Sequence, residues 1–117
     1  MVIHVDEYEI LVKFVKEIYN LSDDEIDEYV TKFPNRVVFE YPVDEYTDII
    51  EVIRNDSEFF VSITYNTESG SDVVKHEAED DFEFNLISCV RNIYTFDLVI
   101  RSEKDLERAL NFFRRFF

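Results

Sequence analysis

The chain has 117 residues, with 27 Asp or Glu and 12 Lys or Arg, so its formal net charge is −15. This length fits a single domain, 1–117, and an apolar content of 46% predicts a packed core rather than a disordered chain. The charge disfavours direct binding to nucleic acid or anionic lipid, since both need Lys and Arg against phosphate. One cysteine excludes an internal disulfide, and no apolar run reaches the roughly 18 residues of a membrane span. We therefore expect a soluble, cytoplasmic protein.

Two helices are predicted at the N-terminus. Residues 5–21 have apolar side chains at helical spacing, with Asp6 placed as the N-cap and Glu9 three residues later. Ser22 and Glu25 then form the pattern of a complete capping box. The apolar residues after it predict a short second helix that Pro34 ends. Together these segments predict a helical hairpin.

The hydrophobic period changes to two after Arg36, which predicts strands. Clear alternation occurs at 37–41, 59–65 and 94–100. Weaker strands are expected at 72–79 and 82–89, after a turn that contains Gly70, the only glycine. One set of alternate side chains in each strand is expected to enter the core.

Residues 46–54 fit two structures. Tyr46, Ile49 and Ile53 have helical spacing, whereas the β-branched content and the following Asn-Asp-Ser turn fit a strand of a hairpin. The β-branched content favours the strand. The sheet is then antiparallel, with five to six strands.

The C-terminal segment predicts the best-defined helix. Ser102 is placed to cap it, with Asp105 three residues later. Its core stripe comprises Leu106, Ala109, Leu110, Phe113 and Phe117. Phe112 and Phe116 lie beside this stripe, where they either widen the core face or form a contact between two copies in a homodimer. The whole order predicts an α+β fold, with the C-terminal helix packed on one sheet face.

A short acidic motif with a terminal tyrosine occurs three times. Val-Asp-Glu-Tyr occupies 5–8 and 43–46, and Ile-Asp-Glu-Tyr occupies 26–29. The first copy starts a helix, the second lies within the predicted second helix, and the third follows Pro42 at a turn or a helix start. Unequal spacing excludes a structural repeat, so local structural preferences account for most of the recurrence.

Acidic residues are concentrated in three segments separated along the chain. They are 23–28, 44–51 and 77–83, which excludes a single acidic tail. Carboxylates fixed on folded elements can imitate a phosphate backbone, and neighbouring aromatic residues can anchor an interface. The alternative is a solvated acidic surface that serves solubility alone. The predicted partner-binding residues are Asp23, Asp24, Asp27, Glu28, Asp44, Glu45, Asp48, Glu77, Glu79, Asp80, Asp81 and Glu83.

The sequence contains no pattern typical of an active site. His76 has acidic neighbours, but alternation along a strand would place them on opposite faces, and Cys89 lies in an apolar segment. A single glycine excludes a glycine-rich phosphate loop. We expect no catalytic residues, no metal site, no cofactor and no enzymatic activity.

These features favour an inhibitor or adaptor that binds the basic surface of another protein, and the expected targets are nucleic-acid-binding proteins. In size and charge the chain is similar to small acidic viral proteins that block host defence nucleases, the anti-CRISPR and antirestriction types, although no motif matches residue by residue. Such a protein would act in the host-cell cytoplasm. Two alternatives remain open: a small acidic chaperone or toxin-immunity protein, and a structural homo-oligomer.

Overall fold

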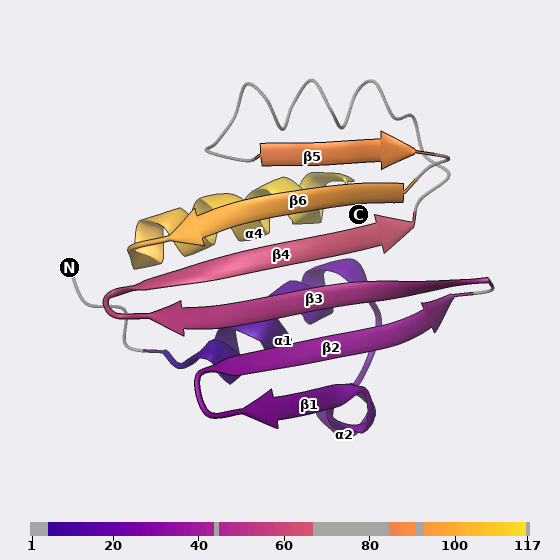
Figure 1. Cartoon of the computed structure of the whole chain (residues 1–117), viewed down its shortest axis with the longest axis horizontal. Coiled ribbons are helices and arrows are strands. Elements are labelled where there is room, and N and C mark those ends of the chain that lie inside the picture. Colours follow the sequence, from indigo (N-terminus) through magenta and orange to yellow (C-terminus); the bar gives the residue numbers. More distant parts are fainter. Residues whose placement is uncertain (1–4, 44, 67–84, 91–92, 117) are drawn as a thin grey trace.

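A six-stranded antiparallel sheet forms one layer of the molecule, and helices form the other (Figure 1). The computed structural model describes residues 5–43, 45–66, 85–90 and 93–116. The strand order is β1-β2-β3-β4-β6-β5, so β1 and β5 are the edge strands and β6 lies between β4 and β5. The elements are α1 (Glu7–Ile18), α2 (Asp23–Glu28), β1 (Val30–Phe33), β2 (Arg36–Val43), β3 (Tyr46–Asn55), β4 (Glu58–Asn66), β5 (Asn85–Val90), β6 (Ile93–Ile100) and α4 (Glu103–Phe116).

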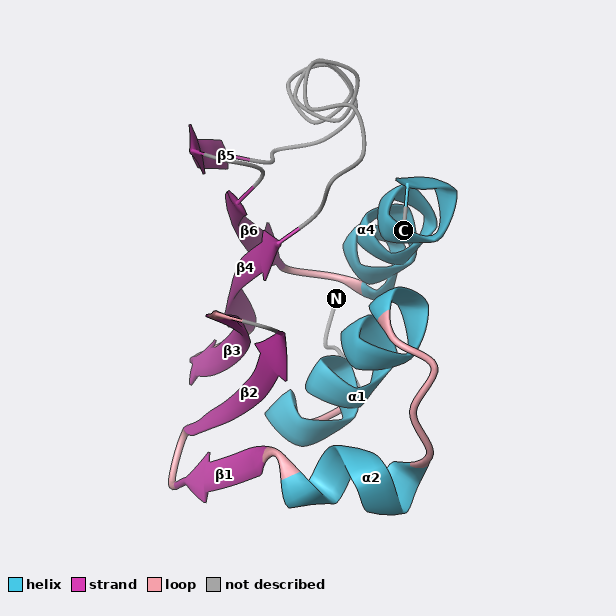
Figure 2. Cartoon of the chain, turned by 90° about the vertical axis from the view of Figure 1, so that its right-hand side faces the viewer, coloured by secondary structure: helices cyan, strands magenta, loops and turns pink. Residues whose placement is uncertain are grey.

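The described helices α1, α2 and α4 lie on the same side of the sheet (Figure 2). This arrangement confirms the predicted α+β fold, with two N-terminal helices and a C-terminal helix packed on one sheet face. Side chains from α1, α4 and the facing side of the strands form one buried cluster. The core therefore lies between the two layers.

Aromatic rings connect the helices to the sheet within this core. Phe113 of α4 packs edge-on against Phe14 of α1, with centroids 5.8 Å apart, and against Phe96 of β6, at 5.6 Å. Each such edge-to-face pair stabilises the folded state by about 0.5–1.5 kcal/mol, in addition to the free energy gained from the apolar area that it buries. Phe113 is thus the residue at which α1, α4 and the sheet meet.

The predicted strand alternation is confirmed where the structure describes side chains. Val37 and Phe39 of β2 are buried, and the same inward parity holds in β4 and β6. The ambiguous segment 46–54 is a strand, β3, as its β-branched content indicated. The weaker strand expected at 82–89 corresponds to β5, whereas the one expected at 72–79 lies outside the described residues.

The prediction for the second helix was wrong after Glu28. The helix ends there, and Val30–Phe33 forms the edge strand β1, paired with β2. Residues 30–33 have helical spacing, but four residues are too few to stabilise a helix by themselves. Hydrogen bonding to β2, across the tight connection at Pro34 and Asn35, therefore determines their structure. The first helix is also shorter than the predicted 5–21, although Asp6 caps it as expected by accepting a bond from the Glu9 amide at 2.8 Å.

The C-terminal helix begins as predicted, and Phe112 takes the core position, one of the two alternatives that the sequence left open. The Asp105 amide donates to the Ser102 hydroxyl at 3.1 Å, which satisfies one free amide of the first turn. Phe112 is only 1% exposed and packs edge-on against Phe113, with centroids 5.2 Å apart. It therefore belongs to the core and is not available for a contact between copies, because α4 packs against both α1 and the sheet and buries a wide face. The Phe116 side chain lies outside the described residues.

Substitution of Phe112 tests this placement. We expect Phe112→Ala to lower the free energy of unfolding by about 3–5 kcal/mol, because the lost ring leaves a cavity in the core. Urea denaturation measures the loss, and sedimentation velocity should give the same oligomeric state as the wild type. The exposed Lys104 of the same helix is the control, and Lys104→Ala should change stability by less than about 0.5 kcal/mol. A small loss of stability together with a changed oligomeric state would place Phe112 at an interface instead.

Candidate protein-binding surface

No described element covers the face of the sheet opposite the helices (Figure 2). Strand register assigns alternate residues of five strands to this side, because neighbouring partners in an antiparallel sheet point to the same face. We call this surface the open face. Its described residues are Thr31, Phe33, Arg36, Val38, Glu40, Pro42, Thr47, Ile49, Glu51, Ile53, Asn55, Glu58, Phe60, Ser62, Thr64, Thr95, Asp97 and Val99.

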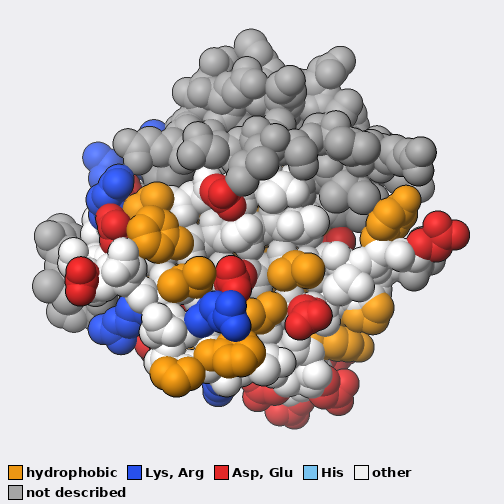
Figure 3. All heavy atoms as spheres, viewed as in Figure 1, with side chains coloured by type: hydrophobic (Ala, Val, Ile, Leu, Met, Phe, Trp, Pro, Cys, Tyr) orange, Lys and Arg blue, Asp and Glu red, His pale blue; other side chains and the backbone are white. Residues whose placement is uncertain are grey.

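Large apolar side chains are exposed on the open face. Phe33 is 42% exposed, and Ile49 and Phe60 are each 37% exposed. Figure 3 shows hydrophobic side chains distributed across this side of the molecule, between acidic and basic ones. Scattered single apolar residues are ordinary on protein surfaces, whereas several on one sheet face are typical of an interaction site.

Arg36 lies among the exposed apolar side chains of the open face. Arg36 pairs with Glu51 at 3.2 Å, and its guanidinium lies 4.3 Å from the centroid of the Phe33 ring. A second exposed pair joins Arg101 to Glu58 at 3.0 Å. Exposed pairs of this kind contribute about 0–1 kcal/mol each, so they orient side chains more than they stabilise the fold.

A hollow of about 500 Å³ lies between β3, β4 and β6 on the open face. It is lined by Glu51, Ile53, Phe60, Val61, Ser62, Asp97, Leu98 and Val99. Its volume falls in the range of pockets that hold small ligands or single side chains of a partner. Apolar walls and two carboxylates thus meet in one depression.

A second acidic feature lies on α2, at the lower margin of Figure 3. The α2 acidic cluster comprises five exposed residues: Asp23, Asp24, Glu25, Asp27 and Glu28. The Glu25 amide donates to the Ser22 hydroxyl at 3.3 Å, and the Ser22 amide donates to the Glu25 carboxylate at 3.1 Å. This capping box starts the helix, and acids in its first turn are favoured by the helix dipole.

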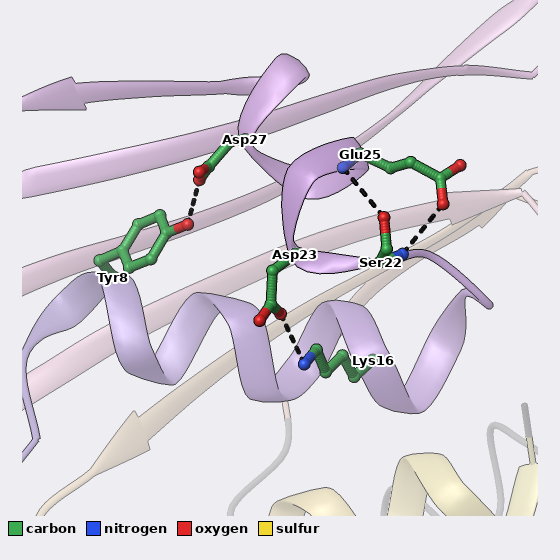
Figure 4. A network of polar contacts seen from close by, with 6 residues as sticks. All are labelled: Tyr8, Lys16, Ser22, Asp23, Glu25 and Asp27. Atoms are coloured by element: carbon green, nitrogen blue, oxygen red, sulfur yellow. Dashed lines mark hydrogen bonds and ion pairs between the residues drawn. The ribbon is translucent and has the colours of Figure 1, made fainter.

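Three of these five acids have partners within the protein (Figure 4). Asp23 pairs with Lys16 at 2.6 Å, Glu25 closes the capping box, and Asp27 accepts a hydrogen bond from the Tyr8 hydroxyl. This bond, with partial burial and nearby carboxylates, raises the pKa of Tyr8 to about 12. Asp24 and Glu28 form no hydrogen bond or ion pair with any described residue. They are the members of the cluster most available to a partner.

The bond between Tyr8 and Asp27 also bears on the repeated motif. Tyr8 ends the first copy, 5–8, and Asp27 belongs to the second copy, 26–29. The two copies therefore join α1 to α2. Tyr29 does not lie within a helix as predicted but caps the end of α2. Of the third copy, Val43 ends β2 and Tyr46 begins β3.

The predicted partner-binding residues fall into three groups. Asp23, Asp24, Asp27 and Glu28 come together on α2, and Glu45 is exposed in the turn between β2 and β3. Six further residues lie outside the described part of the chain: Asp44, Glu77, Glu79, Asp80, Asp81 and Glu83. Asp48 is 2% exposed and points into the core side of β3, so its assignment to an acidic surface was wrong.

Asp48 is buried because its partners are buried with it. The Tyr19 hydroxyl of the segment after α1 donates to the Asp48 carboxylate. Rings of Tyr41 and Tyr65 pack on Tyr19, with centroids 5.0 Å and 6.1 Å away. Burial and then the bond to Asp48 raise the pKa of Tyr19, and burial and then the nearby Asp48 raise that of Tyr65. A buried carboxylate left without a donor would cost several kcal/mol, so this pair fixes the position of Tyr19.

The open face was not anticipated as a site, although the sequence held a signal for it. The outward positions of the predicted alternation include Val38, Phe60 and Val99. Polar residues are expected at such positions when one face of a sheet is exposed to solvent. Apolar residues of both parities in one strand indicate a second apolar surface. That surface is covered in some folds and serves binding in others.

Comparison with known proteins identifies no relationship for this chain. No family model matches it, and no curated protein or solved structure matches it significantly. In the described part of the chain, no three His, Cys, Asp or Glu residues form a group suited to a metal ion. Among the helices of that part, none has the length and apolarity needed to cross a bilayer.

The pH dependence of stability tests the pair of Tyr19 and Asp48. Because the folded state raises the pKa of Tyr19, its contribution is fully present below about pH 10, the pKa in the unfolded chain, and is lost as pH rises further. Tyr19→Phe should lower the free energy of unfolding by about 1–3 kcal/mol near neutral pH, since Asp48 loses a donor. Urea denaturation between about pH 8 and pH 11 should show a smaller decline for this variant than for the wild type.

Tyr46→Phe is the matched control, because Tyr46 is 38% exposed and begins the strand that carries Asp48. Its alkaline decline should follow that of the wild type. An equal decline for Tyr19→Phe and the wild type would contradict the assigned role of Tyr19.

Proposed function

We propose that the chain is a non-enzymatic protein-binding inhibitor or adaptor that docks on a basic surface of another protein. The observation that supports this proposal is the open face, where exposed apolar side chains and carboxylates occur together on one side of a rigid sheet. The α2 acidic cluster extends the negative charge beyond that face. A partner with complementary Lys or Arg residues around an apolar centre fits both features.

Apolar and charged groups would have different roles in such a complex. Phe33, Ile49 and Phe60 supply buried contact area, and aromatic anchors commonly account for most of the binding energy of an interface. Carboxylates would increase the association rate and exclude acidic partners more than they would add affinity. The net charge of −15 acts in the same direction over longer distances.

A binding role also agrees with the exposure of the carboxylates. Asp24 and Glu28 are in water at the surface. An exposed carboxylate can form ion pairs with Lys or Arg side chains of a partner, whereas general acid–base catalysis depends on a carboxyl group held in a buried site. The arrangement thus suits recognition of a cation better than proton transfer.

One observation favours a second candidate, a small acidic chaperone. The exposed row of Phe33, Ile53 and Phe60 would also receive an extended apolar segment of an unfolded client. The two candidates differ in the state of the partner. An inhibitor or adaptor binds a folded protein, whereas a chaperone releases its client when the client folds.

Binding to a purified partner tests the proposal. The immobilised chain would be used to capture proteins, and the retained protein would then be purified and titrated in a calorimeter. We expect a one-to-one complex with a folded basic protein, whose affinity falls at least about tenfold between roughly 50 and 500 mM salt because exposed charges are screened.

Two variants separate the contributions of charge and apolar contact. The double variant Asp24→Asn, Glu28→Gln should slow association, whereas Phe60→Ser should accelerate dissociation, both relative to the wild type. Lys104→Ala, on the opposite side of the molecule, is the control. An affinity unaffected by salt and by all of these changes would contradict the proposal, and binding of unfolded proteins alone would favour the chaperone.

A further inference from the structure

We propose that the hollow between β3, β4 and β6 is a subsite for an arginine side chain of the partner protein. This inference rests on the proposed function and specifies the group that the open face recognises. The hollow lies at the middle strands of the sheet, so a side chain entering it would be at the centre of the interface rather than at its margin.

Register explains why the hollow combines two kinds of wall. Ile53, Phe60 and Val99 are direct neighbours across β3, β4 and β6 and form an apolar row. Glu51, Ser62 and Asp97 are likewise direct neighbours and form a polar row. The rows are two residues apart on each strand, so both face outward and their side chains stand beside each other. A ligand there would meet an aromatic ring on one side and carboxylates on the other.

This combination matches the chemistry of arginine. The guanidinium is planar, stacks on aromatic faces and donates hydrogen bonds in a fork that fits a carboxylate. Its alkyl chain can at the same time lie on aliphatic side chains, here Ile53 and Val99. A purely apolar ligand would bury the carboxylate of Asp97 without a donor, which is unfavourable.

The open face already holds one arginine in this manner. Arg36 stands in the same row as Ile53 and Phe60, lies over the ring of Phe33 and pairs with Glu51. At the hollow, Phe60 and Asp97 likewise provide an aromatic ring and a carboxylate, here on the adjacent strands β4 and β6. Asp97 forms no ion pair with any described residue. The hollow thus offers a guanidinium the same kinds of partner that Arg36 has, an aromatic ring and a carboxylate. No guanidinium of a described residue is paired with Asp97.

The two carboxylates of the hollow differ in availability. Glu51 already forms an ion pair with Arg36, at 3.2 Å, whereas Asp97 forms no ion pair with a described basic residue. Asp97 is therefore the carboxylate expected to accept the incoming guanidinium, and Phe60 the ring expected to stack on it. Glu51 lies across the hollow and adds negative potential.

A titration with single amino-acid derivatives tests the subsite directly. The probe is N-acetyl-L-arginine amide, and N-acetyl-L-citrulline amide, which has nearly the same shape without the charge, is the matched control. Backbone NMR of the labelled protein should show saturable shifts centred on Glu51, Phe60 and Asp97 with the arginine probe. The citrulline probe should give no saturable shift there, and N-acetyl-L-lysine amide should bind more weakly because its ammonium lacks the planar fork.

Variants identify the groups responsible. Asp97→Asn should weaken binding of the arginine probe about fivefold, the upper range for a partly exposed ion pair. Phe60→Leu, which keeps an apolar wall, should weaken it through loss of stacking and provides a second test if Asp97→Asn does not fold. Glu103→Gln removes an exposed acid on the helical side and should leave binding unchanged.

Equal binding of the citrulline probe, or unchanged binding by Asp97→Asn and Phe60→Leu, would overturn the arginine subsite. A partner complex that persists in both variants and still depends on salt and on Asp24 and Glu28 would overturn the subsite while leaving the proposed function intact. Binding of the arginine probe without any salt-dependent partner would support the subsite and contradict the proposed function.

Discussion

Packing of the described helices α1, α2 and α4 on one face of the sheet determines the rest of this structure. Between the layers, Phe113 of α4 packs on Phe14 of α1 and on Phe96 of β6, which joins the two helices to each other and α4 to the sheet. Strands β2, β3, β4 and β6 each have one set of side chains in the core and the other set on the side without a described layer. The open face, its hollow and its exposed aromatic residues are direct consequences of this two-layer arrangement.

Carboxylates have at least two roles in the molecule. Some are structural: Asp6 and Glu25 start helices, Asp27 joins α2 to Tyr8, and Asp48 holds Tyr19 within the core. Others are left to solvent on α2 and the open face. A net charge of −15 opposes association of two copies of the chain, which supports the proposal of a basic partner for the open face.

Much of the fold could be predicted from hydrophobic periodicity and helix capping, because both depend on residues that are close together in the sequence. Asp6, Ser22 and Ser102 cap helices as predicted, and alternation gave the inward residues of β2, β4 and β6 correctly. The second helix was extended too far, because the pairing of β1 with β2 depends on a partner strand and not on its own four residues. Local patterns cannot include that contribution.

The candidate site was predicted only in part, for a similar reason. Asp48 shares its parity with Ile50 and Val52 on β3, so strand register alone would have placed it inward. Acidity suggested a surface instead, and the donor from Tyr19 that permits burial comes from a segment 29 residues away. The open face similarly required knowledge of which side the helices cover.

The most direct test of this account is the solvent exposure of the two sheet faces, measured by NMR with a soluble paramagnetic agent and methyl-labelled protein. The account predicts strong broadening of the methyl signals of Ile49, Ile53 and Val99, and protection of those of Ile50, Val52 and Leu98. Equal protection of both sets at low protein concentration would contradict it, because a further layer or a second copy would then cover the face assigned to a partner.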